Sequence, residues 1–461
     1  MNKNARGQQD MGTGSVSALL VKLAVPAVVA QLISLLYNIV DRIYIGHIPE
    51  IGASALTGVG LCMPILIFIN AFAALAGSGG APRAAIAMGK EDYRGAEKIL
   101  ANCFTIMLIL AALLTVFFYT SAPMLLQMFG ASDVTLPYAL SYIRIYVLGT
   151  VSVMLVMGMN MFITTQGFST FSMLTTVIGA VINIILDPIM IFTFHMGVQG
   201  AAVATVISQC VSALWILLFL TGKKTLLHLK ASDMPLKKDI ILPCLALGLS
   251  SFVMFSTESL LTISFNSSLA RYGGDIAVGT MTILTSVYQL IMLPIQGVCQ
   301  GGQPIMSFNF GAGKKERVKQ TFRLMFGICL GYTVLFTTLV MATPATFAKI
   351  FNNNTVLIEY TVWSMRIYMA GSFFMGCQVS CQQGFMALGQ AKISLLLACL
   401  RKVILLIPLI YILPCIISNQ VFAVFLAEPI ADVVASAVTG YMFFSRFNGI
   451  LDKDSGSGKK I

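Results

Sequence analysis

Two acidic residues stand inside stretches of sequence that are otherwise apolar. Asp41 lies in YNIVDRIYIG and Asp187 lies in VINIILDPIMIF. An ionisable side chain inside a bilayer costs about 2.5 to 3.5 kcal/mol on insertion scales, so each one retained there indicates a function. Asn183 precedes Asp187 by one helical turn, and Asn38 and Tyr37 precede Asp41 in the same way. On helices, these polar side chains would share a face with the acids.

These side chains would form a cation site if their helices bring them together. Two carboxylates that approach each other in a dry cavity favour proton uptake, because the proton removes their mutual repulsion. Carboxylate, amide and hydroxyl oxygens also suit a hard cation such as sodium, so the residues leave both ions open. The alternative is a hydrogen-bonded cluster that only fixes helix packing, and the cost of burying two acids counts against it.

The composition is that of an integral membrane protein with many spans. Of the 461 residues, 57% are hydrophobic and 10% are charged, and the mean hydropathy is +0.87. Soluble domains carry about 25% charged residues. A helix of about 20 apolar residues crosses a bilayer, and we therefore predict an all-α protein with twelve transmembrane helices. The predicted spans are 16–46, 52–77, 93–119, 138–163, 168–194, 197–221, 240–270, 276–305, 319–343, 359–387, 392–415 and 419–445.

The basic residues are distributed unevenly between the two sides of this predicted bundle. The formal net charge is +11, and most of the 29 Lys and Arg fall in the termini and in the loops that share a side with them. Cytoplasmic loops of membrane proteins carry such an excess. We therefore expect both termini in the cytoplasm, and we interpret the charge as topological rather than as a nucleic-acid surface.

The two halves of the chain share a sequence pattern. YALSYIRIYVLG aligns with YTVWSMRIYMAG, which pairs Arg144 with Arg366 and Gly149 with Gly371, and upstream GSGGAP aligns with CQGGQP. The chain therefore reads as a tandem duplication of six helices, a parallel repeat about an axis along the membrane normal. We expect lobes at 15–222 and 239–447, a linker at 223–238 and polar tails at 1–14 and 448–461, with alternating access between the lobes.

The charged residues of the second half differ from those of the first. Ile263 and Leu409 occupy the positions that align with Asp41 and Asp187, so the repeated fold does not require the two acids. Arg401 is expected to form a structural ion pair with Glu428 or Asp432 of the neighbouring helix. Glu258 has no obvious basic partner in the sequence, and we predict that it faces a cationic substrate. All ten cysteines lie in or beside apolar spans, which favours packing roles over a metal site.

The motifs together resemble those of the multidrug and toxic compound extrusion (MATE) transporters, in the DinF-like branch that includes the MepA-type efflux pumps. They include LAVPAVVAQLISLLYNIVDRIYIGHI, NIILDPIMIF, GVQGAAVATVISQ and AEPIAD, and the resemblance extends over residues 15–447. It implies two six-helix lobes arranged in a V and an exchange of drugs for protons or sodium.

The resemblance also implies positions for the coupling site. The family's first-lobe cation site matches Asp41, Asn183, Asp187 and Thr205, which are also the candidate Na⁺ ligands, with Tyr37, Tyr142 and Asn160 nearby. Another branch of the family uses acids of the second lobe. The predicted helix 359–387 contains no acid after Tyr360, which favours the first lobe. Asn38 and Glu258 remain candidates for substrate contact.

The predicted function is a secondary antiporter that exports organic, mostly cationic drugs and dyes in exchange for H⁺ or Na⁺. We expect a monomer in the plasma membrane of a prokaryotic cell, with no cofactor besides the coupling ion and no nucleic-acid partner. A flippase for a lipid-linked saccharide is the alternative, but it would need a strongly cationic cavity. A membrane enzyme such as a prenyl transferase would need a DDxxD or HExxH motif, and neither is present.

Overall fold

The computed structural model describes residues 11–351 and 355–455, and this part of the chain is helical throughout, without a β-strand. The first half contains α2 (Val16–Gly46), α3 (Gly52–Gly89), α4 (Tyr93–Met128), α5 (Leu136–Leu148), α6 (Thr150–Thr165), α7 (Ser169–Pro188), η1 (Ile189–Thr193), α8 (Val198–Thr221) and η2 (Ala231–Asp233). The second half contains α9 (Lys238–Gly311), α10 (Lys315–Ala342), α11 (Pro344–Phe351), α12 (Thr355–Tyr368), η3 (Met369–Phe374), α13 (Met375–Ala387), α14 (Ala391–Cys399), η4 (Leu400–Leu406), α15 (Ile407–Ile416) and α16 (Gln420–Ser455).

The predicted spans correspond to these helices with three interruptions. Gly274 has φ +65°, a left-handed conformation that glycine adopts without strain, and it divides α9 into two spans. Within the described residues, ten helices are long and apolar enough to cross a membrane, and α5 with α6, bent by 57°, would be an eleventh. The remaining predicted span, 359–387, consists of α12, η3 and α13. Its buried glutamines, Gln378 and Gln382, bond each other and make this segment less apolar than its neighbours.

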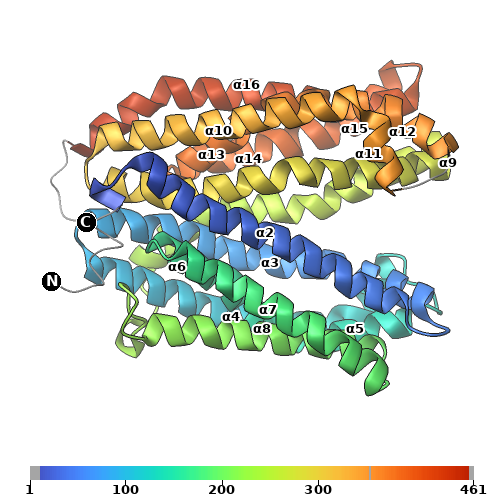
Figure 1. The fold of residues 1–461 in the computed structure, drawn as a ribbon, viewed down its shortest axis with the longest axis horizontal. Helices are drawn as coiled ribbons and strands as arrows, with labels where there is room; N and C mark the ends of the chain where they lie inside the picture. The colour runs from blue at the N-terminus through green and yellow to red at the C-terminus, as the bar shows by residue number, and fades with distance from the viewer. Residues whose placement is uncertain (1–10, 352–354, 456–461) are drawn as a thin grey trace.

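The helices form two bundles, each with a hydrophobic core. One core is built mainly from α2 to α8 and the other from α9 to α16. Figure 1 shows the first bundle below the second, with the start of α2 and the end of α16 at one end of the molecule and the bundles diverging toward the other end. We call this end, where α2 starts and α16 ends, the basic end, because the Lys-rich linker between α8 and α9 and the turns after α3 and α9 also lie there.

The two bundles pack closely near the basic end. A Cβ added to Gly248 of α9 would lie 1.8 Å from the carbonyl oxygen of Leu75 in α3, and one added to Gly79 would lie 2.0 Å from the carbonyl oxygen of Cys244. Only glycine permits backbones to approach so closely. The rings of Phe68 and Phe72 also contact that of Phe252 across the two bundles.

Helix α2 belongs to both bundles. Its second half packs against α7, whereas its first half packs against α9, where a Cβ on Gly301 would lie 2.5 Å from the backbone nitrogen of Ala24. The residues before α2 are also attached to the second bundle. Arg317 donates to the carbonyls of Met11 and Gly14. The helix that carries Asp41 therefore connects the two lobes mechanically.

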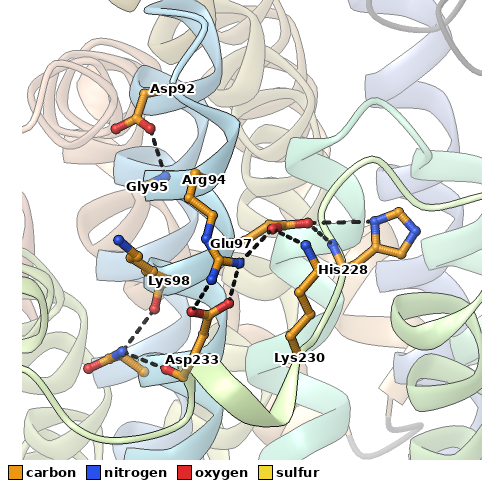
Figure 2. A network of polar contacts seen from close by, with 9 residues as sticks. Asp92, Arg94, Gly95, Glu97, Lys98, His228, Lys230 and Asp233 are labelled. Atoms are coloured by element: carbon orange, nitrogen blue, oxygen red, sulfur yellow. Dashed lines mark hydrogen bonds and ion pairs between the residues drawn. The ribbon is translucent and has the colours of Figure 1, made fainter.

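The linker between the lobes is attached to the first lobe. Figure 2 shows Arg94 of α4 bonding both carboxylate oxygens of Asp233, at 2.6 and 2.9 Å, and Glu97 accepting from Lys230 at 2.6 Å. The side-chain oxygen of Gln166 accepts bonds from three groups of residues 225–227. These charge-assisted or partly buried bonds attach residues 225–233 to the first lobe.

Candidate functional site: a buried acid pair in the first lobe

Asp41 and Asp187 meet between α2 and α7. Their carboxyl groups are close enough to interact electrostatically, so a proton or cation bound at either one is felt by both. Asp187 is completely buried, and Asp41 is half-buried. Asp187 occupies the last turn of α7, immediately before Pro188 and the π-helical turn η1. Such π-helical turns are frequent at functional sites in helices.

An amide and a hydroxyl complete the side of the site formed by α7 and α8. Asn183 donates to Asp187 over 3.2 Å and approaches the hydroxyl oxygen of Thr205 in α8 at 3.4 Å. The one-turn spacing of Asn183 and Asp187 therefore places both side chains on one face, as the sequence predicts. Thr205, which only the family resemblance indicated, lies beside them.

Three oxygen atoms of this group have no hydrogen-bond donor among the described residues. They are Oδ1 of Asp41, Oδ1 of Asn183 and Oδ2 of Asp187, and all three are buried. A buried acceptor without a partner costs about 1 to 3 kcal/mol, and more when it is charged. A proton or a small cation bound here would therefore stabilise the arrangement. The carboxylate, amide and hydroxyl oxygens of the site suit either one.

Two tyrosines lie against the acids. Tyr37, one turn before Asp41 on α2, is close to both carboxyl groups, and Tyr142 of α5 is close to Asp41. Tyr142 is buried and Tyr37 is half-buried, so their rings shield the acid pair from part of its polar surroundings. Asn38 is exposed and donates to the carbonyl of Ser34 at 2.6 Å.

Asn160 lies elsewhere in the first lobe. Its amide donates to the backbone carbonyl of Ser172 at 3.2 Å, and Ser172 precedes Asn183 by about three turns of α7. The resemblance grouped Asn160 with the acids, whereas the structure places its side chain nearer the start of α7. Its own side-chain oxygen is buried without a donor.

The second lobe contains a separate charged cluster. Arg401 donates to Asp432 at 2.8 Å, to Glu428 at 2.9 Å and to the hydroxyl of Tyr288 at 2.8 Å. The guanidinium is 10% exposed and the two carboxylates are 5% and 0% exposed. The structure thus joins Arg401 to both acids that the sequence offered as partners.

The expectation that Glu258 lacks a basic partner is wrong. Lys402, the residue after Arg401, forms a salt bridge with Glu258 and also donates to the carbonyl of Met254. Arg401 and Lys402 both lie in the π-helical turn η4, and both side chains are buried. Sequence spacing gave no sign of the pair, because α9 and η4 are far apart along the chain. The carboxylate of Glu258 is nevertheless 55% exposed, so it remains accessible to a substrate.

Comparison with known proteins places the chain among membrane transporters. The profile of the MatE family matches residues 26–189 and again residues 250–412, once in each half. The multidrug export protein MepA of Staphylococcus saprophyticus is 24% identical over 426 residues, which cover 92% of this chain and 93% of that protein. MepA of Staphylococcus haemolyticus is 23% identical over 430 residues, or 91% and 92% of the two chains. A crystal structure of a MATE protein in a bent conformation has the same fold, with a TM-score of 0.91, 24% identity and coverage of 99% and 100%.

Proposed function

This chain belongs to the MatE family and is a transporter rather than an enzyme, and from that premise we propose that it is a secondary multidrug efflux antiporter. In this proposal it exports organic, mostly cationic and amphipathic compounds in exchange for H⁺ or Na⁺. It acts as a monomer in a prokaryotic plasma membrane, with its basic end in the cytoplasm, as the distribution of Lys and Arg favours. The relatives named multidrug export proteins support the substrate class.

The observation that carries this proposal is the set of three buried oxygens without donors at the acid pair. Asp41 and Asp187 supply two of them and Asn183 supplies the third. A site that is short of positive charge binds a proton or a sodium ion, and its free energy depends on whether the ion is present. The repeat-equivalent positions Ile263 and Leu409 have no such groups, so packing of the six-helix unit does not explain the acids.

Helix α2 offers a route from the ion to the arrangement of the lobes. Asp41 lies on the half that packs against α7, and the other half packs against α9 of the second lobe. A cation that alters how α2 seats against α7 also alters the balance between arrangements of the two lobes. Coupling requires that the cation bind the two arrangements with different affinities, because a ligand that binds both equally does not change their relative populations.

The substrate would bind where the lobes face each other. The aromatic rings of Phe68, Phe72 and Phe252 close this region on the side of the basic end. Aromatic faces attract cations. The carboxylate of Glu258 is paired with Lys402 through one oxygen but is 55% exposed, so it can also contact a cationic group. Lipophilic cations therefore suit this surface. The flippase alternative is disfavoured, because the two buried cations of η4, Arg401 and Lys402, are both bonded to carboxylates and are not free to bind a diphosphate.

The test is transport of ethidium by the purified protein in proteoliposomes, with a pH gradient and a sodium gradient imposed separately. We expect one gradient to drive transport in the wild type, and neither to drive it in Asp41→Asn or Asp187→Asn. The exposed loop acid Asp133 provides the control, and Asp133→Asn should behave as the wild type. Gradient-driven transport that persists in both acid variants would refute the coupling site.

A further inference from the structure

Two cysteines from different lobes meet near the basic end. Cys103 lies on α4 of the first lobe and Cys244 lies near the start of α9 in the second lobe. The sulfur of Cys103 lies against Gly80 and the backbone of Cys244 lies against the adjacent Gly79. The two thiols are close enough to interact, and both residues are completely buried. The contact occurs beside Gly79, where the backbones of α3 and α9 approach each other closely.

A basic side chain accompanies the two thiols. The guanidinium of Arg83 in α3 lies near both thiols, and its Nε atom is buried without an acceptor. In residues 11–351 and 355–455 no carboxylate forms a salt bridge with Arg83. The position that aligns with Arg83 in the second half is Ile305, so the repeated fold does not need this arginine.

This combination is suited to thiol oxidation. A cation beside a cysteine favours the thiolate, which is the nucleophile that peroxides oxidise. A second thiol in contact then resolves the oxidised sulfur as a disulfide. We propose that Cys103 and Cys244 form an oxidative modification site, at which hydrogen peroxide or another hydroperoxide generates a disulfide between the lobes.

Disulfide formation at this site takes two steps. The Cys244 thiolate attacks one oxygen of the peroxide, the O–O bond breaks, and hydroxide leaves as the sulfur becomes a sulfenic acid. The Cys103 thiol then attacks that sulfur, the S–S bond forms, and the sulfenic hydroxyl leaves as water. In sum, two thiols and one hydrogen peroxide give one disulfide and two waters.

Access to the buried thiols depends on movement of the lobes. In the present arrangement neither side chain is exposed, so a peroxide reaches Cys244 only when the lobes separate at the basic end. That separation is part of the alternating access on which the proposed function rests. Oxidation therefore proceeds faster in a protein that is transporting substrate, and closure brings Cys103 to the oxidised sulfur. The disulfide then holds the basic end closed and stops transport until a thiol reductant cleaves it.

The chain contains a matched control for this site. Cys299 and Cys329 also contact each other, with their sulfur atoms 3.9 Å apart, but both belong to the second lobe. A disulfide at that position would not join the lobes. Oxidation of this pair separates a general effect of peroxide on buried thiols from a lock between the lobes.

The experiment treats the full-length protein in proteoliposomes with hydrogen peroxide, with and without ethidium. Mass spectrometry of the digested protein then identifies disulfide-linked peptides. We expect a Cys103–Cys244 link that forms several-fold faster during transport, a loss of at least tenfold in transport rate, and recovery with dithiothreitol. Cys244→Ser and Cys244→Ala should keep their transport rate in peroxide, whereas Cys299→Ser should lose it as the wild type does. Arg83→Met should slow formation of the link.

Two results would overturn the proposal. One is the absence of a Cys103–Cys244 peptide after oxidation, and the other is equal peroxide sensitivity of the wild type and both Cys244 variants. The peptide measurement does not require drug transport. If the link forms but no gradient drives ethidium, the proposed function fails while the modification site stands.

Discussion

Replacement of Gly248 by alanine should shift the protein away from the arrangement in which the basic end is closed. The added Cβ would lie 1.8 Å from the carbonyl oxygen of Leu75. Backbone atoms cannot rotate away, so α3 and α9 must separate by more than an ångström. Overpacking of this kind costs about 1 to 3 kcal/mol. A state destabilised by that amount loses roughly 5- to 150-fold in population relative to its competitor.

Cys244 reports this shift, because it is completely buried where the lobes meet. We expect N-ethylmaleimide to modify Cys244 about 5- to 150-fold faster in Gly248→Ala than in the wild type, as followed by mass spectrometry. Gly327→Ala is the control. Gly327 lies inside helix α10, and no atom would be within 4 Å of its added Cβ. Gly327→Ala therefore changes helix propensity as Gly248→Ala does but introduces no clash. An unchanged rate in a Gly248→Ala protein with the wild-type unfolding temperature would refute this account of the closed interface.

Three further changes test other parts of the structure. Arg401→Met leaves two buried carboxylates without their cation and should destabilise the protein by about 3 to 5 kcal/mol, measured by thermal unfolding in detergent. Replacement of the exposed Arg366 by methionine should change stability by no more than about 0.5 kcal/mol. Equal effects of the two substitutions would contradict the burial argument. Glu97→Gln should make the linker more sensitive to trypsin, because the bonds to Lys230 and its neighbours weaken, whereas the exposed Glu316→Gln should not. Thr205→Val removes one hydroxyl from the ion site and should raise the concentration of coupling ion for half-maximal transport by about 2- to 12-fold; an unaltered ion dependence would exclude Thr205 as a ligand.

The sequence predicted the helices and the acid pair well for one physical reason. Apolar length identifies spans, and an acid inside such a span is conspicuous because burial of charge is costly. The one-turn spacing also placed Asn183 beside Asp187 correctly. These signals are local, so the sequence contains them directly.

Contacts between distant helices were the part that could not be predicted. Glu258 of α9 and Lys402 of η4 form a salt bridge, and no sequence pattern around either residue indicates the other as its partner. The break of the span 359–387 at η3 was likewise unforeseen, as was the attachment of the linker to α4. The sequence favours packing roles for the cysteines and assigns Cys103 and Cys244 to different lobes, but only the fold shows that the two residues meet.

The attachment of the linker indicates where the gene could be divided. Residues 225–233 are bonded to α4 and Gln166, so a break within them would leave loose ends on a surface that the first lobe uses for its own packing. A break between Lys237 and Lys238 instead leaves these bonds within the first fragment and gives each fragment most of one core. The start of α2 would still seat against α9, so the co-expressed halves should assemble without a covalent connection.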